Sequence, residues 1–155
     1  MSFCFAQTEK TLKLSSPSFQ HNSYIPYEYT CDGKDINPEL RIEGIPQNTE
    51  TMALIVDDPD APMGTWVHWV VFNIPAISAI KENSIPGTQG KNDFGKLNWG
   101  GPCPPSGTHR YFFKLYCLDT TLSLKEGATK NELERAMEGH ILASAELIGL
   151  YKRLR

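Results

Sequence analysis

No stretch of the 155-residue sequence approaches the about 20 consecutive apolar residues that a membrane-spanning helix requires. A strong charge of either sign is also lacking, because 15 basic residues stand against 18 acidic ones, a net charge of −3. So weak a charge gives no general attraction to nucleic acid or to anionic membranes. We therefore expect no nucleic-acid partner and no stable membrane insertion, and any bound anion must be held by a local site.

Cysteine is scarce, and none of the four cysteines forms a CxxC pair or a zinc-finger spacing. The first residues lack the basic start and apolar core of a secretory signal, so we expect a cytoplasmic protein. Cys117 lies in an apolar run and is expected to be a small core residue. Cys31 and Cys103 lie in loops rich in Gly and Pro and could pair if the fold brings these loops together. In a reducing cytoplasm free thiols are the more frequent state and are the favoured expectation here, although the sequence leaves the pairing open.

The 11 prolines and 12 glycines are spread along the chain and divide it into short segments. Between them lie runs rich in β-branched and aromatic residues, which are typical of strands. The predicted strands are Thr51–Asp57, Trp66–Ile74, His109–Leu118, and short ones near Leu12–Leu14 and Tyr27–Thr30. Many short strands separated by turn signals predict a β-sandwich or barrel.

One helix is well signalled near the end of the chain. Thr129 and Glu132 have the spacing of a capping box, in which each side chain bonds to the backbone of the other. Apolar residues follow at helical spacing, and Gly139 predicts the end of the helix. Ile141–Tyr151 is ambiguous, but its alternation favours a terminal strand.

Three aspartates surround two prolines where the first long strand ends, at Val56–Pro62. Proline restricts both its own backbone and that of the preceding residue, so Asp58 and Asp60 are expected on a rigid turn. In the simpler reading, the aspartates only bond to local amides in an Asx turn. That reading explains one aspartate more easily than three, so we treat this turn as a candidate site.

His68 alternates along its strand with Trp66, Val70, Phe72 and Ile74, which predicts that it shares an apolar face with them. A histidine on such a face is more often a core residue with a satisfied partner than a ligand-binding group. The strand position alone therefore does not make His68 a site residue.

A loop rich in Gly and Pro, from Trp99 to Thr108, leads into a strand that opens with His109, Arg110 and Tyr111. Glycine amides can approach a ligand closely and form an anion-binding nest. His109 and Tyr111 fall on one strand face, whereas Arg110 points to the other and is expected in a structural ion pair. An aspartate near a histidine favours the cationic imidazole, so these segments could together bind a phosphate monoester that carries an ammonium group.

At these segments the sequence resembles the phosphatidylethanolamine-binding protein family, also called Raf kinase inhibitor-like proteins, and looks closest to its small bacterial members. The motifs are DPDAP at Asp58–Pro62, W-x-H at Trp66–His68, and GGPCPP followed by HRY at Gly100–Pro105 and His109–Tyr111. Shorter matches at CDG (31–33), NPEL (37–40), NDFG (92–95) and AxxGHxLAxAxL (136–147) extend the resemblance over nearly the whole chain.

The resemblance implies that residues 1–155 form one domain, a mostly-β sandwich of two antiparallel sheets with Greek-key connections and one or two short helices. It implies a small pocket at one end that binds phosphate or phosphorylethanolamine-like groups, without cofactor or metal. The family's pocket residues correspond here to Asp58, Asp60, His68, Gly100, Gly101, His109 and Tyr111. Some members regulate kinases and some inhibit serine proteases, so a kinase or protease partner is compatible with the resemblance, but no motif carries either role over to this chain.

The leading hypothesis is a binding protein, not an enzyme, that holds a small phosphorylated or other anionic ligand. The alternative is a metal-assisted or acid/base phosphoester hydrolase, in which Asp58, Asp60, His68 and His109 ligate a divalent metal, although no HExxH-like pair is present. A third reading is a regulator that acts through Gln89–Leu97 or the Pro-rich loop. A homodimer is compatible with each reading.

Overall fold

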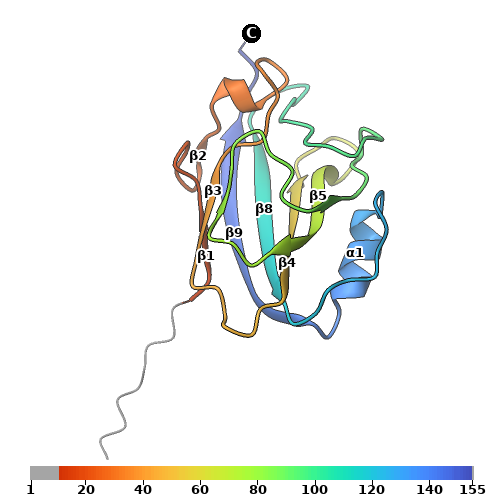
Figure 1. The fold of residues 1–155 in the computed structure, drawn as a ribbon. Helices are drawn as coiled ribbons and strands as arrows, with labels where there is room; N and C mark the ends of the chain where they lie inside the picture. Colours follow the sequence, from red (N-terminus) through yellow and green to blue (C-terminus); the bar gives the residue numbers. More distant parts are fainter. Residues whose placement is uncertain (1–10, 155) are drawn as a thin grey trace, which may run out of the picture.

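The structure, a computed structural model, describes residues 11–154; Cys4 and most of the N-terminal stretch that lacks the pattern of a secretory signal lie outside this range. The chain forms two β-sheets, and the one α-helix of the described part lies against the larger sheet (Figure 1). The prediction of a mostly-β fold with two sheets is confirmed. No helix of the described residues has the length and apolar character needed to cross a membrane.

The larger sheet has six strands in the order β2, β9, β8, β4, β5, β7, and the smaller has three in the order β1, β3, β6. The bounds in the larger sheet are Ser23–Tyr24 (β2), Ile141–Tyr151 (β9), His109–Leu118 (β8), Thr51–Asp58 (β4), Trp66–Pro75 (β5) and Thr88–Gln89 (β7). Those in the smaller are Lys13–Ser15 (β1), Leu40–Glu43 (β3) and Ala79–Ile80 (β6). All neighbours are antiparallel except β2 and β9, which run parallel.

The three long strands in the middle of the sheet explain where a site can form. β4 and β5 are a hairpin, and a long connection then leads to β8, which pairs with β4 on the side away from β5. Consequently the C-terminal end of β4 and the N-terminal ends of β5 and β8 meet at the same end of the sheet. β9 returns antiparallel along β8, and its C-terminal residue Tyr151 lies at this same end of the sheet.

The three long predicted strands and the terminal strand are confirmed, with bounds that agree within one residue. The strand expected at Tyr27–Thr30 is wrong, because Tyr27–Tyr29 forms a 3-10 helix (η1) after Pro26. Its turn is closed by the backbone amide and the hydroxyl of Thr30, which both donate to the Tyr27 carbonyl.

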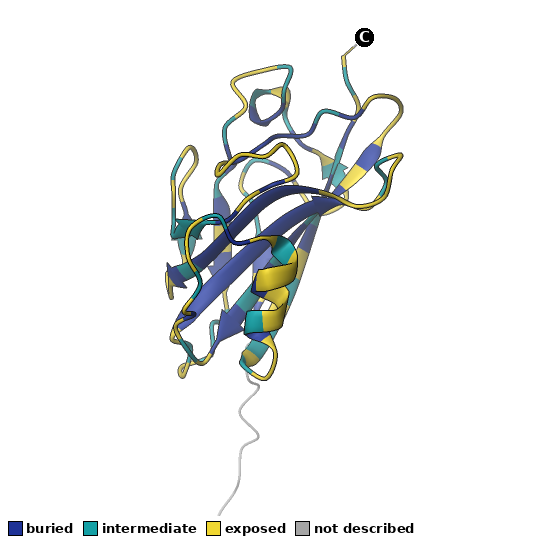
Figure 2. Cartoon of the chain, turned by 90° about the vertical axis from the view of Figure 1, so that its right-hand side faces the viewer, coloured by how far each residue is buried: buried dark blue, intermediate teal, exposed yellow. Residues whose placement is uncertain are grey.

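The larger sheet separates two hydrophobic cores. One lies between the sheets and includes Trp69, Trp99 and Phe113; the other lies under the helix and includes Phe72 and Leu133. Figure 2 shows the long strands buried and the outer surface of the helix exposed. Because both faces of β4 are covered, all eight of its residues are buried, which explains its continuous apolar run.

The helix, α1 (Lys130–Met137), begins with the predicted capping box, and Gly139 follows it with φ +79°. An ion cluster joins it to the sheet. The buried Asp57 carboxylate accepts hydrogen bonds from Lys114 Nζ at 3.0 Å and Lys130 Nζ at 2.8 Å. Asp57, the first of the three aspartates, therefore serves the packing of α1.

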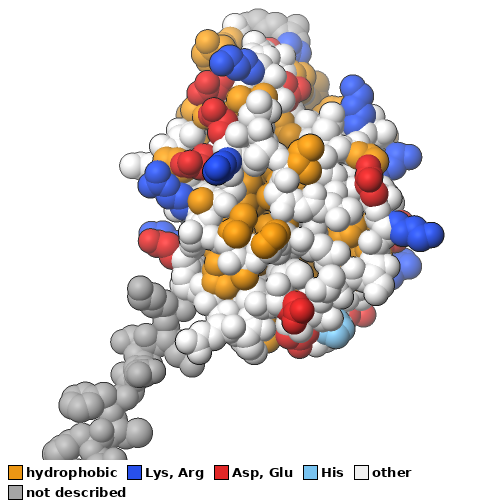
Figure 3. Space-filling view, in the orientation of Figure 1, with side chains coloured by type: hydrophobic (Ala, Val, Ile, Leu, Met, Phe, Trp, Pro, Cys, Tyr) orange, Lys and Arg blue, Asp and Glu red, His pale blue; other side chains and the backbone are white. Residues whose placement is uncertain are grey.

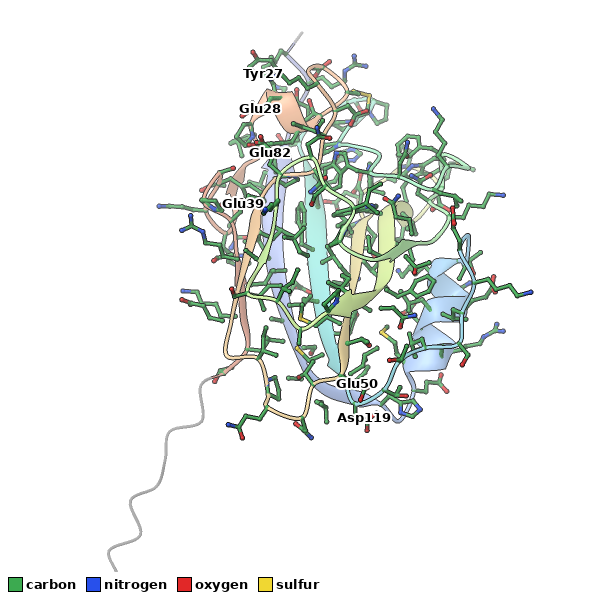
Figure 4. All side chains as sticks on the ribbon, in the orientation of Figure 1. Tyr27, Glu28, Glu39, Glu50, Glu82 and Asp119 are labelled. Atoms are coloured by element: carbon green, nitrogen blue, oxygen red, sulfur yellow. A yellow bond between two sulfur atoms is a disulfide. The ribbon has the colours of Figure 1, made fainter. Side chains whose placement is uncertain are left out.

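Acidic side chains gather at the η1 end of the molecule, where Figure 4 labels Glu28 and Glu82. The Tyr29 hydroxyl donates to Glu82 Oε1 at 2.5 Å. Burial, and then this bond and the neighbouring negative charge, raise the pKa of Tyr29 to about 12. On the face seen in Figure 3, charged groups lie mainly toward the margin and hydrophobic side chains reach the surface nearer the middle.

Candidate functional site

Asp58 and His109 form a buried pair where β4 ends and β8 begins. His109 Nδ1 and Asp58 Oδ2 are 2.6 Å apart, and fewer than one tenth of either side chain is exposed. The other Asp58 oxygen accepts the backbone amide of Asp60 at 2.7 Å. Because a carboxylate only accepts, His109 donates from Nδ1 and turns Nε2 to a ligand. The predicted proximity of an aspartate and a histidine is confirmed.

His68 occupies a β-bulge near the start of β5. In the pairing with β4, Val67 lies opposite Asp57 and Trp69 lies opposite Val56, so His68 is the extra residue. The bulge reverses the alternation, and Val70 and Phe72 pack under α1 while Trp69 packs between the sheets. The prediction that His68 shares a face with Val70 and Phe72 is therefore wrong.

The loop that precedes β8 fixes the His68 ring. His68 Nδ1 donates to the Gly100 carbonyl at 2.6 Å, and the Gly100 amide donates back to the His68 carbonyl at 3.0 Å. The ring also meets the rings of Phe94 and Tyr111 edge-on, at centroid distances of 5.4 and 5.2 Å. Burial lowers the pKa of His68 below its usual value, so the ring is neutral near pH 7.

Asn92 shapes the loop that brings Phe94 to the site. Its Oδ1 accepts the amides of Phe94 and Lys96, and its Nδ2 donates to the Asn98 carbonyl. Asp93 then ties this loop to the bulge, because its Oδ2 accepts the Val67 amide at 2.7 Å. The NDFG loop is thus hydrogen-bonded directly to the W-x-H strand.

Tyr111 lies two residues beyond His109 on the same face of β8, as predicted. It is 1% exposed, and its hydroxyl has no hydrogen-bond partner among the residues that the structure describes. Burial and the charge of Asp58 raise the pKa of Tyr111 above its ordinary value, so the phenol keeps its proton. A buried, unpaired hydroxyl is costly unless a ligand or water pairs with it.

Asp60 lies outside this group of residues. Its carboxylate makes two bonds to the Arg110 side chain, at 2.9 and 2.8 Å, and accepts the Arg110 amide. The bond to Arg110 lowers the pKa of Asp60 to about 2. The structural ion pair expected for Arg110 is confirmed, but the placement of Asp60 in the pocket is corrected.

Gly100 and Gly101 bond to the protein itself instead of presenting their amides to a ligand, which was the prediction. The Gly100 amide bonds to His68 and the Gly101 amide to Asp35 Oδ1 at 2.8 Å, so neither is free to form an anion nest. A Cβ at Gly100 would meet the Phe94 ring at 2.5 Å. These positions require glycine for close packing of the loop.

Cys31 and Cys103 form a disulfide, with a Cα–Cα distance of 5.5 Å. The expectation of free thiols at these two positions is wrong. The loops are also held by a hydrogen bond from the Cys31 amide to the Pro102 carbonyl. Because Cys103 lines the pocket, the disulfide anchors one of its walls to the loop after η1.

These elements enclose a pocket of about 270 Å³, near the lower end of the range of about 300–1,000 Å³ for small-molecule sites. Of the seven predicted site residues, four line it: Asp58, His68, His109 and Tyr111. The remaining lining residues are Ala61, Pro62, Met63, Trp66, Phe94, Cys103, Pro104 and Pro105. A larger hollow of about 560 Å³ borders the start of α1 and contains none of the predicted residues.

The apolar lining was missed as a set because its members come from three separate loops and the start of β5. Each of these residues except Met63 stood within a quoted motif, Phe94 within NDFG, but the motifs drew attention to their polar side chains. As possible metal ligands the pocket offers Asp58, His68 and His109. Within residues 11–154, however, no group of three His, Cys, Asp or Glu side chains is arranged to hold a metal ion.

Comparisons with known proteins agree with this architecture. Residues 15–152 match the family model for phosphatidylethanolamine-binding protein. A UPF0098 protein of Pyrococcus horikoshii is 51% identical, with 95% of this chain and 79% of that protein aligned. One from Methanothermobacter thermautotrophicus is 50% identical, with 92% of this chain and 99% of that protein aligned.

Two solved structures share the fold. A homologue of phosphatidylethanolamine-binding protein from Chlamydia trachomatis has a TM-score of 0.90 and 41% identity, and the match covers 92% of this chain and 98% of that one. YbcL of Escherichia coli, described as a member of the mammalian family, has a TM-score of 0.85 and 28% identity, covering 93% and 99%. The chain therefore belongs to the phosphatidylethanolamine-binding protein family.

Proposed function

We propose that this protein binds a small oxyanion, such as the phosphate group of a phosphorylated ligand, in the pocket between Asp58, His68, His109 and Tyr111. The observation that carries the proposal is the buried Tyr111 hydroxyl, a donor without a partner in the described protein. An anion oxygen would satisfy it. His109, oriented through Nδ1 by Asp58, would add a charge-assisted hydrogen bond from Nε2 when protonated.

The walls support the same proposal. Met63, Trp66, Phe94 and the two prolines after Cys103 surround the polar floor with apolar surface. Apolar walls lower the local dielectric constant and strengthen each hydrogen bond that the floor makes to an anion. The small volume suits one phosphate group with a short substituent better than a phospholipid with its acyl chains.

The test is an NMR titration of labelled protein with phosphorylethanolamine and inorganic phosphate. We expect saturable shifts at Asp58, His68, His109 and Tyr111. Tyr111→Phe should weaken binding about 10- to 100-fold, the usual effect of losing a hydrogen bond to a charged group. Tyr116→Phe is the matched control, because it removes a hydroxyl from the same strand outside the pocket. No shifts at millimolar ligand, or equal affinity of Tyr111→Phe and wild type, would contradict the proposal.

The same samples separate binding from catalysis. Release of inorganic phosphate from phosphorylethanolamine, followed by phosphorus NMR, would favour the phosphoester hydrolase over a binding protein. A kinase or protease partner is a further part of the proposal. It would be supported if wild type captured a kinase or protease in a pull-down and inorganic phosphate reduced the amount captured. Capture by Tyr111→Phe should then not respond to phosphate.

A further inference from the structure

His68 presents one defined atom to the pocket. The Gly100 carbonyl, 2.6 Å from Nδ1, can only accept a hydrogen bond, so Nδ1 carries a hydrogen. The ring is buried, and the desolvation that lowers its pKa keeps it neutral. A neutral imidazole has one N–H, so Nε2 carries a lone pair and acts as an acceptor.

The ring cannot easily exchange these roles. A flip would withdraw the Nδ1 donor from the Gly100 carbonyl, and the rings of Phe94 and Tyr111 pack edge-on with the imidazole. The backbone bond from the Gly100 amide to the His68 carbonyl holds the bulge against the loop. The acceptor therefore keeps a fixed direction.

A donor and an acceptor thus stand together without partners. The Tyr111 hydroxyl is a buried donor without a partner, and within residues 11–154 the hydrogen bond found for the His68 ring is the one from Nδ1 to the Gly100 carbonyl, which leaves Nε2 for a ligand. A protonated phosphate group offers both complements, an O⁻ for the hydroxyl and a P–OH for the imidazole. Sulfate has no proton at neutral pH and would place an oxygen lone pair against that of Nε2.

We propose that His68 is a specificity-determining residue that selects oxyanions carrying a proton, such as inorganic phosphate and the monoanions of phosphate monoesters, over aprotic ones such as sulfate. This inference rests on the proposed function. A site built to accept a hydrogen bond discriminates strongly against an analogue that cannot donate one, because its buried acceptor stays unpaired. We expect phosphate to bind about 10- to 100-fold more tightly than sulfate.

The experiment titrates inorganic phosphate and sodium sulfate at pH 7 and equal ionic strength into wild type, His68→Gln and His109→Gln. A glutamine amide can turn either its oxygen or its NH₂ to the ligand, so in His68→Gln the two affinities should agree within about threefold. His109→Gln should weaken the binding of both anions and leave their ratio close to that of wild type. Imidazole ¹⁵N shifts of wild type give a readout that needs no variant, and Nε2 of His68 should show the unprotonated form.

The outcomes distinguish the two proposals. If both anions bind wild type equally, or if His68 carries its proton on Nε2, the selectivity is refuted while the anion pocket stands. If neither anion binds, the proposed function fails and the selectivity fails with it. A preference for phosphate that persists in a folded His68→Gln variant would assign the selectivity to another group.

Discussion

The disulfide between Cys31 and Cys103 should contribute a large part of the stability of this small domain. It joins residues 72 positions apart, and a crosslink removes conformational entropy from the unfolded chain in proportion to the logarithm of the loop length. For a loop of this size the chain-entropy relation gives about 4 kcal/mol at 25 °C. Typical domains are stable by only about 5–15 kcal/mol, so the loss should be conspicuous.

Guanidinium unfolding with and without dithiothreitol measures this term in wild type and in the Cys31→Ala, Cys103→Ala double variant. Reduction should lower the free energy of unfolding of wild type and steepen its denaturant dependence, because the uncrosslinked chain unfolds to a larger state. The double variant should match reduced wild type and ignore the reductant. It keeps Cys4 and Cys117, so it controls for any effect of the reductant on those thiols. A difference below about 1 kcal/mol between the oxidised and reduced proteins would refute the entropic reasoning.

The disulfide also bears on the compartment. Stable disulfides are typical of oxidising environments and of intracellular proteins from hyperthermophiles, and they are rare in other cytoplasmic proteins. The cytoplasmic location expected from the N-terminal residues therefore stays a prediction. Alkylation of free thiols in intact cells, followed by mass spectrometry of the peptide with Cys103, would report the state of the bond.

Three further predictions concern stability. The pKa of His68 in the folded protein lies below its unfolded value of about 6.5. The neutral ring therefore makes its full contribution to the free energy of unfolding above about pH 6.5, and this contribution is lost as the pH falls. Between pH 7 and 5 the free energy of unfolding of His68→Gln should fall less than that of wild type, by up to about 1.4 kcal/mol per pH unit. Asp57→Asn should cost about 1–3 kcal/mol in urea unfolding, because Lys114 and Lys130 lose their shared carboxylate but still reach solvent; no loss would show that the cluster adds nothing. Thr129→Ala should cost about 1 kcal/mol and Thr129→Ser much less, since serine keeps the capping hydroxyl.

The sequence predicted the strands that carry enough residues to show a pattern. β4, β5, β8 and β9 are eight residues or longer, whereas β2, β6 and β7 have two residues each and β3 has four, too few for a period. β2, β6 and β7 are edge strands and β3 lies between β1 and β6, so in each case the partner strand decides the structure. At Tyr27–Tyr29 the aromatic residues suggested a strand, but local hydrogen bonds at Thr30 close a helical turn instead.

The polar floor of the site was more predictable than its surroundings. Asp58, His109 and Tyr111 sit at the ends of predicted strands, where their neighbours could be inferred. The role of Gly100 could not be inferred from the sequence, because only the folded loop shows which carbonyl and which ring lie beside this residue. The ion pair of Asp60 depends likewise on β8 lying next to β4, which is a property of the topology and not of local spacing.

The bulge at His68 makes the proposed binding group separable from the strand that holds it. Val67 packs under α1 and Trp69 packs between the sheets, which is the alternation that these two residues would have if they were consecutive. His68 is thus a one-residue insertion into the pleat of β5, which has a second irregularity opposite Met52–Leu54. A variant that lacks His68 should keep every core side chain of β5 on its present face of the larger sheet, while the pocket loses the proposed acceptor. The protein could in this way gain or lose selectivity by a change of length, without the repacking that a substitution in the core demands.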